Sequence, residues 1–236
     1  MYREEKDYYY VDRFKKNGIT AVYTKKSLGN MSDYCKSEDN PSENRMKLLE
    51  ILNLTGRTEV KSHQTHSNNI KIINEHVTRY SYHGIDGFVT NRKDVALFTF
   101  YADCLPIFIY DMENKAIGVA HSGWPGTYME IQKSLLETMI KEYGSDPKNI
   151  LLALGIGIGV SDYEVGTEFY EKFTEKFDRE LIENSFIYSK NKSKYYFDNV
   201  GFNKITALRM GISDKNIITA SESTMEEKFH SYRREG

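Results

Sequence analysis

The sequence predicts a fold of the α+β class, with mixed helices and strands. Short apolar runs bounded by turn residues dominate before residue 120 and indicate strands, whereas strand and helix patterns alternate after it. The 236 residues suffice for one large domain or two small ones. Because we find no internal repeat, low-complexity segment or convincing linker, we expect a single domain over residues 1–236.

Strands dominate the expected first part of the chain. A strand at residues 18–24 precedes a polar loop at 29–43. The apolar residues after Arg45 have helical spacing, and this helix is expected to end near Gly56. Further strands are expected at residues 58–62, 69–74, 88–90 and 95–100, with a loop around residue 66 and a turn at 82–87.

Two continuous apolar runs, at residues 105–110 and 115–120, predict a pair of strands that are buried on both faces. A helix is expected from Gly126 to residue 143, because Gly144 is a typical helix end. The remaining expected elements are a strand at 149–154, a glycine-rich loop at 155–159, helices at 168–177 and 203–210, a solvated loop at 190–194, and a last strand at 216–220.

Charge and cysteine content exclude several classes of protein. The chain has 32 basic and 34 acidic side chains and a formal charge of −2, so it has no long-range field for nucleic acid or an anionic membrane. Its two cysteines, Cys35 and Cys104, do not make a disulfide framework. The charged N-terminus is not a secretory signal, and no apolar stretch has the length of a membrane span. We expect a cytoplasmic monomer or small homo-oligomer with Cys104 as a free thiol.

Three side chains in separate segments form a candidate metal site. His66, Cys104 and His121 supply two imidazoles and a thiolate, which hold a transition metal with one position open. Cys104 could instead be a small buried hydrophobe, but its neighbours Asp103 and Pro106 are poor central-strand residues and indicate a strand end. His121 could be a core histidine, yet it directly precedes a turn that leads into a helix. The long sequence separations fit ligands gathered from different strands.

Other motifs carry weaker signals. His63 and His66 would point to opposite faces of a strand but to the same side of a helical turn. The glycines at 155–159 lack the full phosphate-loop pattern and fit close backbone packing or a ligand pocket better. Arg45 and Arg233 are either surface charges or planar donors that grip phosphate.

Taken in order, these segments resemble the YfiH-like family, also called the polyphenol oxidase (laccase-domain) or purine nucleoside phosphorylase family. The resemblance covers most of the chain, from about Asn40 to Arg234, and the ordered set of motifs is highly specific. It rests on Asp39-Asn40-Pro41 with Asn44-Arg45, Gln64-Thr65-His66, Asp86-Gly87-Phe88-Val89-Thr90-Asn91, Ala102-Asp103-Cys104-Leu105-Pro106, Ala120-His121-Ser122-Gly123-Trp124-Pro125-Gly126, residues 154–159, Tyr163-Glu164-Val165-Gly166 and Phe229-His230-Ser231-Tyr232-Arg233-Arg234.

The resemblance implies a layered α/β sandwich of the YfiH-like type with one metal site. The family's ligands map onto His66, Cys104 and His121, which sets His63 aside, and zinc is expected rather than copper. The chain also departs from the family pattern, because Pro125 stands where relatives usually have arginine. That change removes a cation beside the site. Residues 221–224 also lack a cysteine, and proline is missing after Gly155.

The resemblance further implies an enzyme whose partners are a purine nucleoside and phosphate. The implied reactions are phosphorolysis of adenosine, inosine, guanosine or methylthioadenosine, and hydrolytic deamination of adenosine. A metal site with an open position suits both. The expected catalytic residues are Cys104, His121 and Asp103, and the expected substrate or phosphate contacts are Arg45, Asp86 and Arg233. Asp86 and Asp103 are also candidates for orienting a metal-bound histidine or relaying a proton.

Three alternatives stay open. A copper-dependent polyphenol oxidase is disfavoured by six histidines without a His-x-His pair, although copper competes well for such ligands. In a cysteine hydrolase acting on a cell-wall precursor, Cys104 would be the nucleophile, His121 or His66 the base, and the peptide N–H groups after Gly123 the oxyanion hole. A non-catalytic relative would bind nucleoside and metal without turnover.

Overall fold

A computed structural model describes residues 1–35, 38–76, 80–189 and 193–235. Within these residues the strands form four sheets. The central sheet has the order β15 (Ile217–Thr219), β11 (Ile150–Leu154), β9 (Leu105–Asp111), β10 (Ile117–Ser122), β7 (Gly87–Thr90) and β5 (Ile70–Ile72). The outer pairs β15–β11 and β7–β5 are parallel, and the inner pairs are antiparallel.

The other strands make three small sheets. Their orders are β1 (Tyr2–Glu4), β2 (Tyr8–Val11) and β3 (Val22–Thr24); β6 (Ser81–His83), β4 (Thr58–His63) and β8 (Val95–Leu97); and β12 (Glu164–Val165), β14 (Lys194–Phe197) and β13 (Phe186–Ser189). The α-helices are α1 (Asp12–Lys15), α2 (Pro41–Ile51), α3 (Trp124–Tyr128), α4 (Ile131–Tyr143), α5 (Thr167–Thr174), α6 (Arg179–Ser185), α7 (Asn199–Arg209) and α8 (Tyr232–Glu235).

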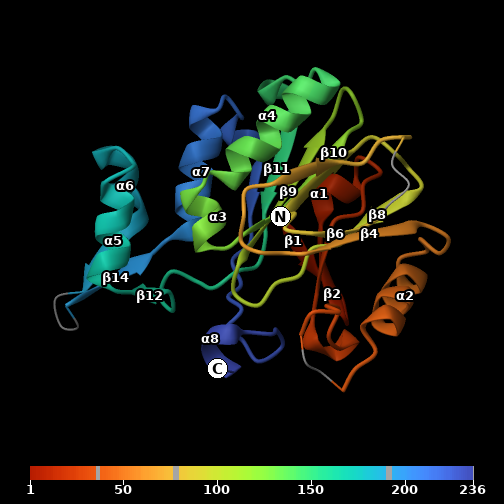
Figure 1. The fold of residues 1–236 in the computed structure, drawn as a ribbon, viewed down its shortest axis with the longest axis horizontal. Coiled ribbons are helices and arrows are strands. Elements are labelled where there is room, and N and C mark those ends of the chain that lie inside the picture. Colours follow the sequence, from red (N-terminus) through yellow and green to blue (C-terminus); the bar gives the residue numbers. More distant parts are fainter. Residues whose placement is uncertain (36–37, 77–79, 190–192, 236) are drawn as a thin grey trace.

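Strand β11 shows how the central sheet is covered on both faces. Ile150, Leu152 and Leu154 pack in one core with α4 and α7. Leu151 and Ala153 point the other way and pack with side chains of the β1–β2–β3 sheet. All five side chains are fully buried, which is why this strand is continuously apolar rather than alternating. Figure 1 shows α4 and α7 beside the strands of the central sheet and α5 and α6 farther out.

The β6–β4–β8 sheet covers another part of the central sheet. Val60 of β4 and Val95 of β8 pack against Phe88 of β7 and Val119 of β10. Helices on one face and small sheets on the other make a layered arrangement, so the predicted mixed α/β fold is confirmed. Among the described helices, none is long and apolar enough to cross a membrane.

Several expected elements differ from those found. The helix expected from Gly126 is two helices, α3 and α4, because Glu130 between them has a left-handed backbone, with φ of 61°. The expected turn at 82–87 begins inside strand β6. Strands β1, β2, β12, β13 and β14 and helix α6 had no predicted counterpart. Most of the loop expected at 190–194 lies outside the described residues.

Arg45 attaches helix α2 to the β6–β4–β8 sheet. Its side chain is fully buried. The guanidinium donates hydrogen bonds to Glu59 of β4 at 3.0 Å, to the Met31 carbonyl at 2.6 Å and to Asp33 at 3.1 Å. Removing one partner of a buried ion pair leaves the other charges desolvated. Arg45 is therefore a structural link between α2, the segment before it and β4.

We predict that Arg45→Ala lowers the free energy of unfolding by about 3 kcal/mol, the lower end for broken buried ion pairs, because Asp33 and Glu59 retain some water. Urea denaturation followed by circular dichroism measures the change. The matched control is Arg209→Ala, which removes an arginine that also pairs with two carboxylates but lies at the surface. The free energy of unfolding of Arg209→Ala should decrease by much less than that of Arg45→Ala. Equal losses in the two variants would contradict the structural role of Arg45.

Candidate metal centre

The side chains of His66, Cys104 and His121 converge at one end of the central sheet. Cys104 directly precedes β9, and His121 lies near the end of the adjacent strand β10. The antiparallel register pairs Ser122 with Leu105, which brings these two segments together. His66 follows β4 in the loop that leads to β5. The candidate ligand atoms of all three residues lie within 4.8 Å of one another, and Cys104 Sγ is 3.7 Å from His66 Nε2.

The cluster is enclosed on one side and open on the other. His121 is buried, with 4% of its surface exposed, whereas Cys104 is half-buried and His66 is exposed. All three line a cavity of about 1440 Å³. The walls of this cavity near the cluster include Trp124 and Tyr163. The open side of the cluster therefore faces this cavity.

Gly123 is required by the close packing of the ligands. A Cβ atom at this position would lie 2.5 Å from His66 Cδ2 and 2.9 Å from Cys104 Sγ, so any other residue would push the ligands apart. His66 itself has a left-handed backbone with φ of 60°, and so does Asp103 with φ of 85°. Strained non-glycine residues of this kind persist only where the surrounding contacts hold them.

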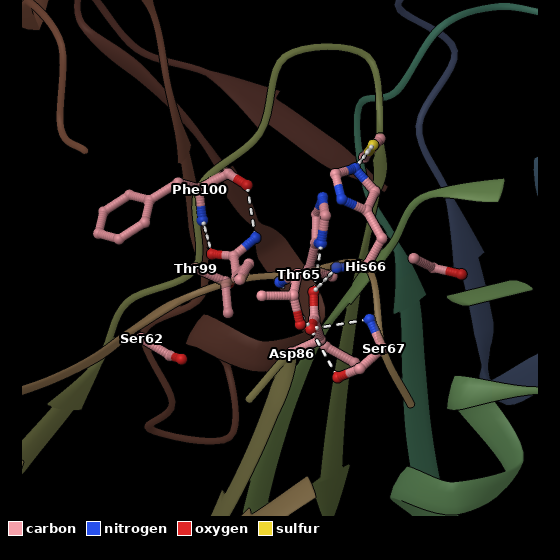
Figure 2. A network of polar contacts seen from close by, with 12 residues as sticks. Ser62, Thr65, His66, Ser67, Asp86, Thr99 and Phe100 are labelled. Carbon is pink, nitrogen blue, oxygen red and sulfur yellow. Dashed lines mark hydrogen bonds and ion pairs between the residues drawn. The ribbon is translucent and has the colours of Figure 1, made fainter. Parts of the chain in front are cut away.

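The carboxylate of Asp86 holds both histidines. Figure 2 shows Asp86 between the segment that carries Thr65, His66 and Ser67 and the strands of the central sheet. The carboxylate accepts a hydrogen bond from His121 Nδ1 at 2.9 Å. It also accepts from the backbone N–H groups of Thr65, His66 and Ser67 at 3.1, 3.0 and 2.9 Å, and from Ser67 Oγ at 2.7 Å. Asp86 thus fixes the ring of one ligand and the backbone of the other. Since His121 Nδ1 is engaged, Nε2 is the ring nitrogen left for a metal.

The pKa values of the cluster follow from these contacts. Burial alone would raise the pKa of Asp86, but hydrogen bonds from His121 and Ser67 lower it to about 2, so this carboxylate is an anion. Burial likewise opposes ionisation of Cys104, yet the nearby imidazoles of His121 and His66 lower its pKa to about 7. Burial would lower the pKa of His121, but Cys104 and Asp86 raise it to about 9. Without a metal the cluster therefore favours a thiolate beside an imidazolium.

The donor set fits a metal ion. Two imidazoles and a thiolate within reach of one point form the three-ligand arrangement of catalytic zinc sites, and a buried carboxylate behind a ligating histidine is its usual outer partner. The open side toward the cavity leaves the fourth position for a ligand. Within the described residues no other group of three or more histidine, cysteine or carboxylate side chains converges in this way.

Asp103 and Arg233 lie beside the cluster but are engaged by other residues. The Asp103 carboxylate accepts hydrogen bonds from Thr224 Oγ1 and from the backbone N–H of Arg233, both at 2.6 Å. It thereby ties the C-terminal segment to the loop before β9. The Arg233 guanidinium donates to the backbone carbonyls of Glu164 and Asp162 and lines the same cavity as the cluster.

The other candidate residues lie in different places. Arg45 does not line this cavity, so the structure does not bring it to the cluster. Asp86 is fully buried behind the histidines, which matches the expected orienting role rather than direct contact with a ligand. Ser67 and Gly123 were missed as parts of the site. Ser67 directly follows the Gln-Thr-His motif, and Gly123 lies between His121 and the helix start, so closeness to the ligands in sequence was the available signal.

Comparisons with known proteins show what this chain is similar to. The family model described as multi-copper polyphenol oxidoreductase laccase matches residues 15–236. A Rickettsia prowazekii protein named purine nucleoside phosphorylase is 31% identical over 212 residues, covering 87% of this chain and 85% of that protein. A Bacteroides thetaiotaomicron protein of the same name is 27% identical over 226 residues, covering 89% and 83%.

Two solved structures share the fold. The crystal structure of Bacillus licheniformis YfiH has a TM-score of 0.88 and 24% identity, and YlmD from Geobacillus stearothermophilus has a TM-score of 0.88 and 23% identity. Each likeness covers 99% of this chain and 93% of the other. The expected family resemblance is confirmed: this chain belongs to the YfiH-like family, whose family model carries the laccase description.

Proposed function

We propose that this chain is a metal-dependent enzyme that cleaves purine nucleosides with phosphate. The observation that carries the proposal is the His66–Cys104–His121 cluster, which is oriented by a buried carboxylate and open to a large cavity. Relatives that cover most of the chain are named purine nucleoside phosphorylase. The proposed substrates are adenosine, inosine, guanosine and methylthioadenosine, each with inorganic phosphate.

In this proposal, different residues of the chain bind the metal, the purine and the phosphate. A bound zinc ion would supply Lewis-acid chemistry and orient an oxygen nucleophile at the open position. His66, Cys104 and His121 would hold that ion, and Asp86 keeps the two histidines in their ligating orientation. Trp124 and Tyr163 offer aromatic surfaces for the purine. Arg233 would attract the phosphate, because its guanidinium contacts backbone carbonyls and the ring of Tyr163 and forms no ion pair with a carboxylate among the described residues.

The proposal extends to hydrolytic deamination of adenosine. In that reaction water attacks C6 of the purine and ammonia leaves, so the purine ring rather than the ribose would lie at the open position of the cluster. It does not extend to a multicopper oxidase. Such an enzyme needs a cluster of copper ions, and the described residues bring together one group of three or more candidate ligands. The laccase description of the family model is therefore not carried over to the reaction of this chain.

The first test is turnover by zinc-loaded protein incubated with adenosine or inosine and phosphate. We predict release of free base and ribose-1-phosphate, measured by liquid chromatography. Chelation of the metal or His121→Ala should reduce the rate at least about 100-fold, because a ligand itself is lost. The control is His76→Ala, a highly exposed histidine away from the cluster. The proposal would be wrong if wild type and His121→Ala both formed neither free base nor inosine. Thermal stabilisation by nucleoside without product would indicate a binding protein instead.

The second test addresses Asp86. We predict that Asp86→Asn weakens zinc binding about 10–100-fold, because the neutral amide no longer accepts all the hydrogen bonds that orient the histidines. Competition with a chromogenic chelator measures this affinity. Asp111→Asn is a matched control, since Asp111 is also fully buried and accepts hydrogen bonds from the turn after it, but it lies at the other end of β9. Both variants should lose stability, and only Asp86→Asn should lose zinc affinity.

A cysteine hydrolase is the second candidate, favoured by the lowered pKa of Cys104. In metal-free protein we predict that alkylation of Cys104 by iodoacetamide accelerates as the pH rises through about 7, because the thiolate is the reactive form. The Cys35→Ser background isolates this signal from the other, exposed cysteine. Zinc should protect Cys104. Full enzymatic activity in metal-free protein that is lost on alkylation would favour the hydrolase over our proposal.

A further inference from the structure

A second histidine pair lies outside the metal centre, on the β6–β4–β8 sheet. His63 ends β4 and is the register partner of His83 on the parallel strand β6. Partners in register project from the same face of a sheet, and both side chains are exposed. Their ring centroids are 4.9 Å apart with the ring planes at 86°. Two imidazoles from separate strands are thus held in contact at the surface.

The segment before α2 fixes the ring of His63. Burial alternates along β4, so Lys61 and His63 share its outer face. Lys61 pairs with Asp33, and the next residue along the segment, Tyr34, stacks on His63 with ring centroids 4.5 Å apart and an interplanar angle of 11°. This stack uses the face of the imidazole. The ring nitrogens lie at its edge and stay available.

The ring nitrogens of the pair have no other use among the residues that the structure describes. Neither imidazole makes a hydrogen bond or an ion pair through them, and the contacts of both rings are the aromatic ones. Exposed histidines scattered singly need no explanation. These two are in register on neighbouring strands with ring centroids 4.9 Å apart, so a rotation of the rings would bring one nitrogen of each to a shared ion. The strands hold the two backbones in register before any ion binds.

We propose that His63 and His83 form a second metal-binding site for a borderline divalent ion such as Cu²⁺, Ni²⁺ or Zn²⁺. Imidazole nitrogen suits these ions, and water would complete their coordination. The site binds more weakly than the His66–Cys104–His121 cluster, because it has two side-chain ligands and no thiolate. Its histidines are not members of the His66–Cys104–His121 cluster, so the site does not depend on the proposed nucleoside chemistry, although His63 lines the same cavity. Copper bound here would carry no information about the catalytic centre.

The test is a titration of untagged, zinc-preloaded protein with Cu²⁺, followed by electron paramagnetic resonance and visible absorption. We expect copper bound through imidazole nitrogens without the absorption of a copper–thiolate bond. His63→Ala and His83→Ala should each weaken this binding about tenfold or more, because each removes one of two linked ligands. His83→Ala keeps the Tyr34–His63 stack, so it reports on the site even if His63→Ala loosens the segment before α2.

Two controls decide the outcome. His76→Ala removes an exposed histidine outside the pair and should leave copper affinity unchanged. Cys104→Ala disrupts the metal centre and should leave the imidazole-only copper signal in place. Copper affinity unchanged in both pair variants would overturn the proposal. So would an equal loss in His76→Ala, or a copper signal that has thiolate absorption and disappears in Cys104→Ala.

Discussion

The buried carboxylate of Asp86 is the contact on which the site depends. One side chain accepts a hydrogen bond from the ring of His121 and three from successive backbone N–H groups of the 65–67 loop. The 65–67 loop is irregular, and His66 has a strained backbone. Without the Asp86 carboxylate, the N–H groups of this loop would lose their hydrogen-bond acceptor. The anion therefore organises the loop and orients the opposite ligand in the same step. Its low pKa keeps it in that form at physiological pH.

The sheet supplies the remaining order. His121 and Cys104 are far apart in sequence, but the antiparallel register of β9 and β10 fixes them side by side. The core residues around them pack in two clusters, one on each face of the sheet, so a slip in register would move side chains that fit one cluster into the other. Gly123 allows His66 and Cys104 to lie close to the backbone at the end of β10, because a Cβ atom at this position would collide with both side chains. The positions of the cluster side chains therefore depend on the packing on both faces of the central sheet.

Sequence patterns predicted the parts of the structure that depend on local composition. The buried strands β9, β10 and β11 were expected because continuous apolar runs between turn residues have few other outcomes. Strands β13 and β14 were not expected, because each is only four residues long and its phenylalanine is buried by packing with α5, α6 and α7. The three candidate ligands were selected from their chemistry and from motif resemblance, and the structure brings their side chains together. Arg45 carried the same motif signal, yet its burial and ion pairs depend on tertiary contacts that local sequence does not encode.

The carboxylates around the cavity bear on which nucleophile the site favours. Asp86 is buried and saturated with donors. Of the described carboxylates that line the cavity, Asp103 accepts from Thr224 and a backbone N–H, Asp39 accepts from a backbone N–H, and Glu235 pairs with basic side chains. None of them is a free general base. Under the proposed function, water would need either such a base or a bound metal ion to lose its proton, whereas phosphate arrives already as an anion. The positive charge of Arg233 at the cavity wall would attract phosphate more strongly than water, and this supports the proposed phosphorolysis.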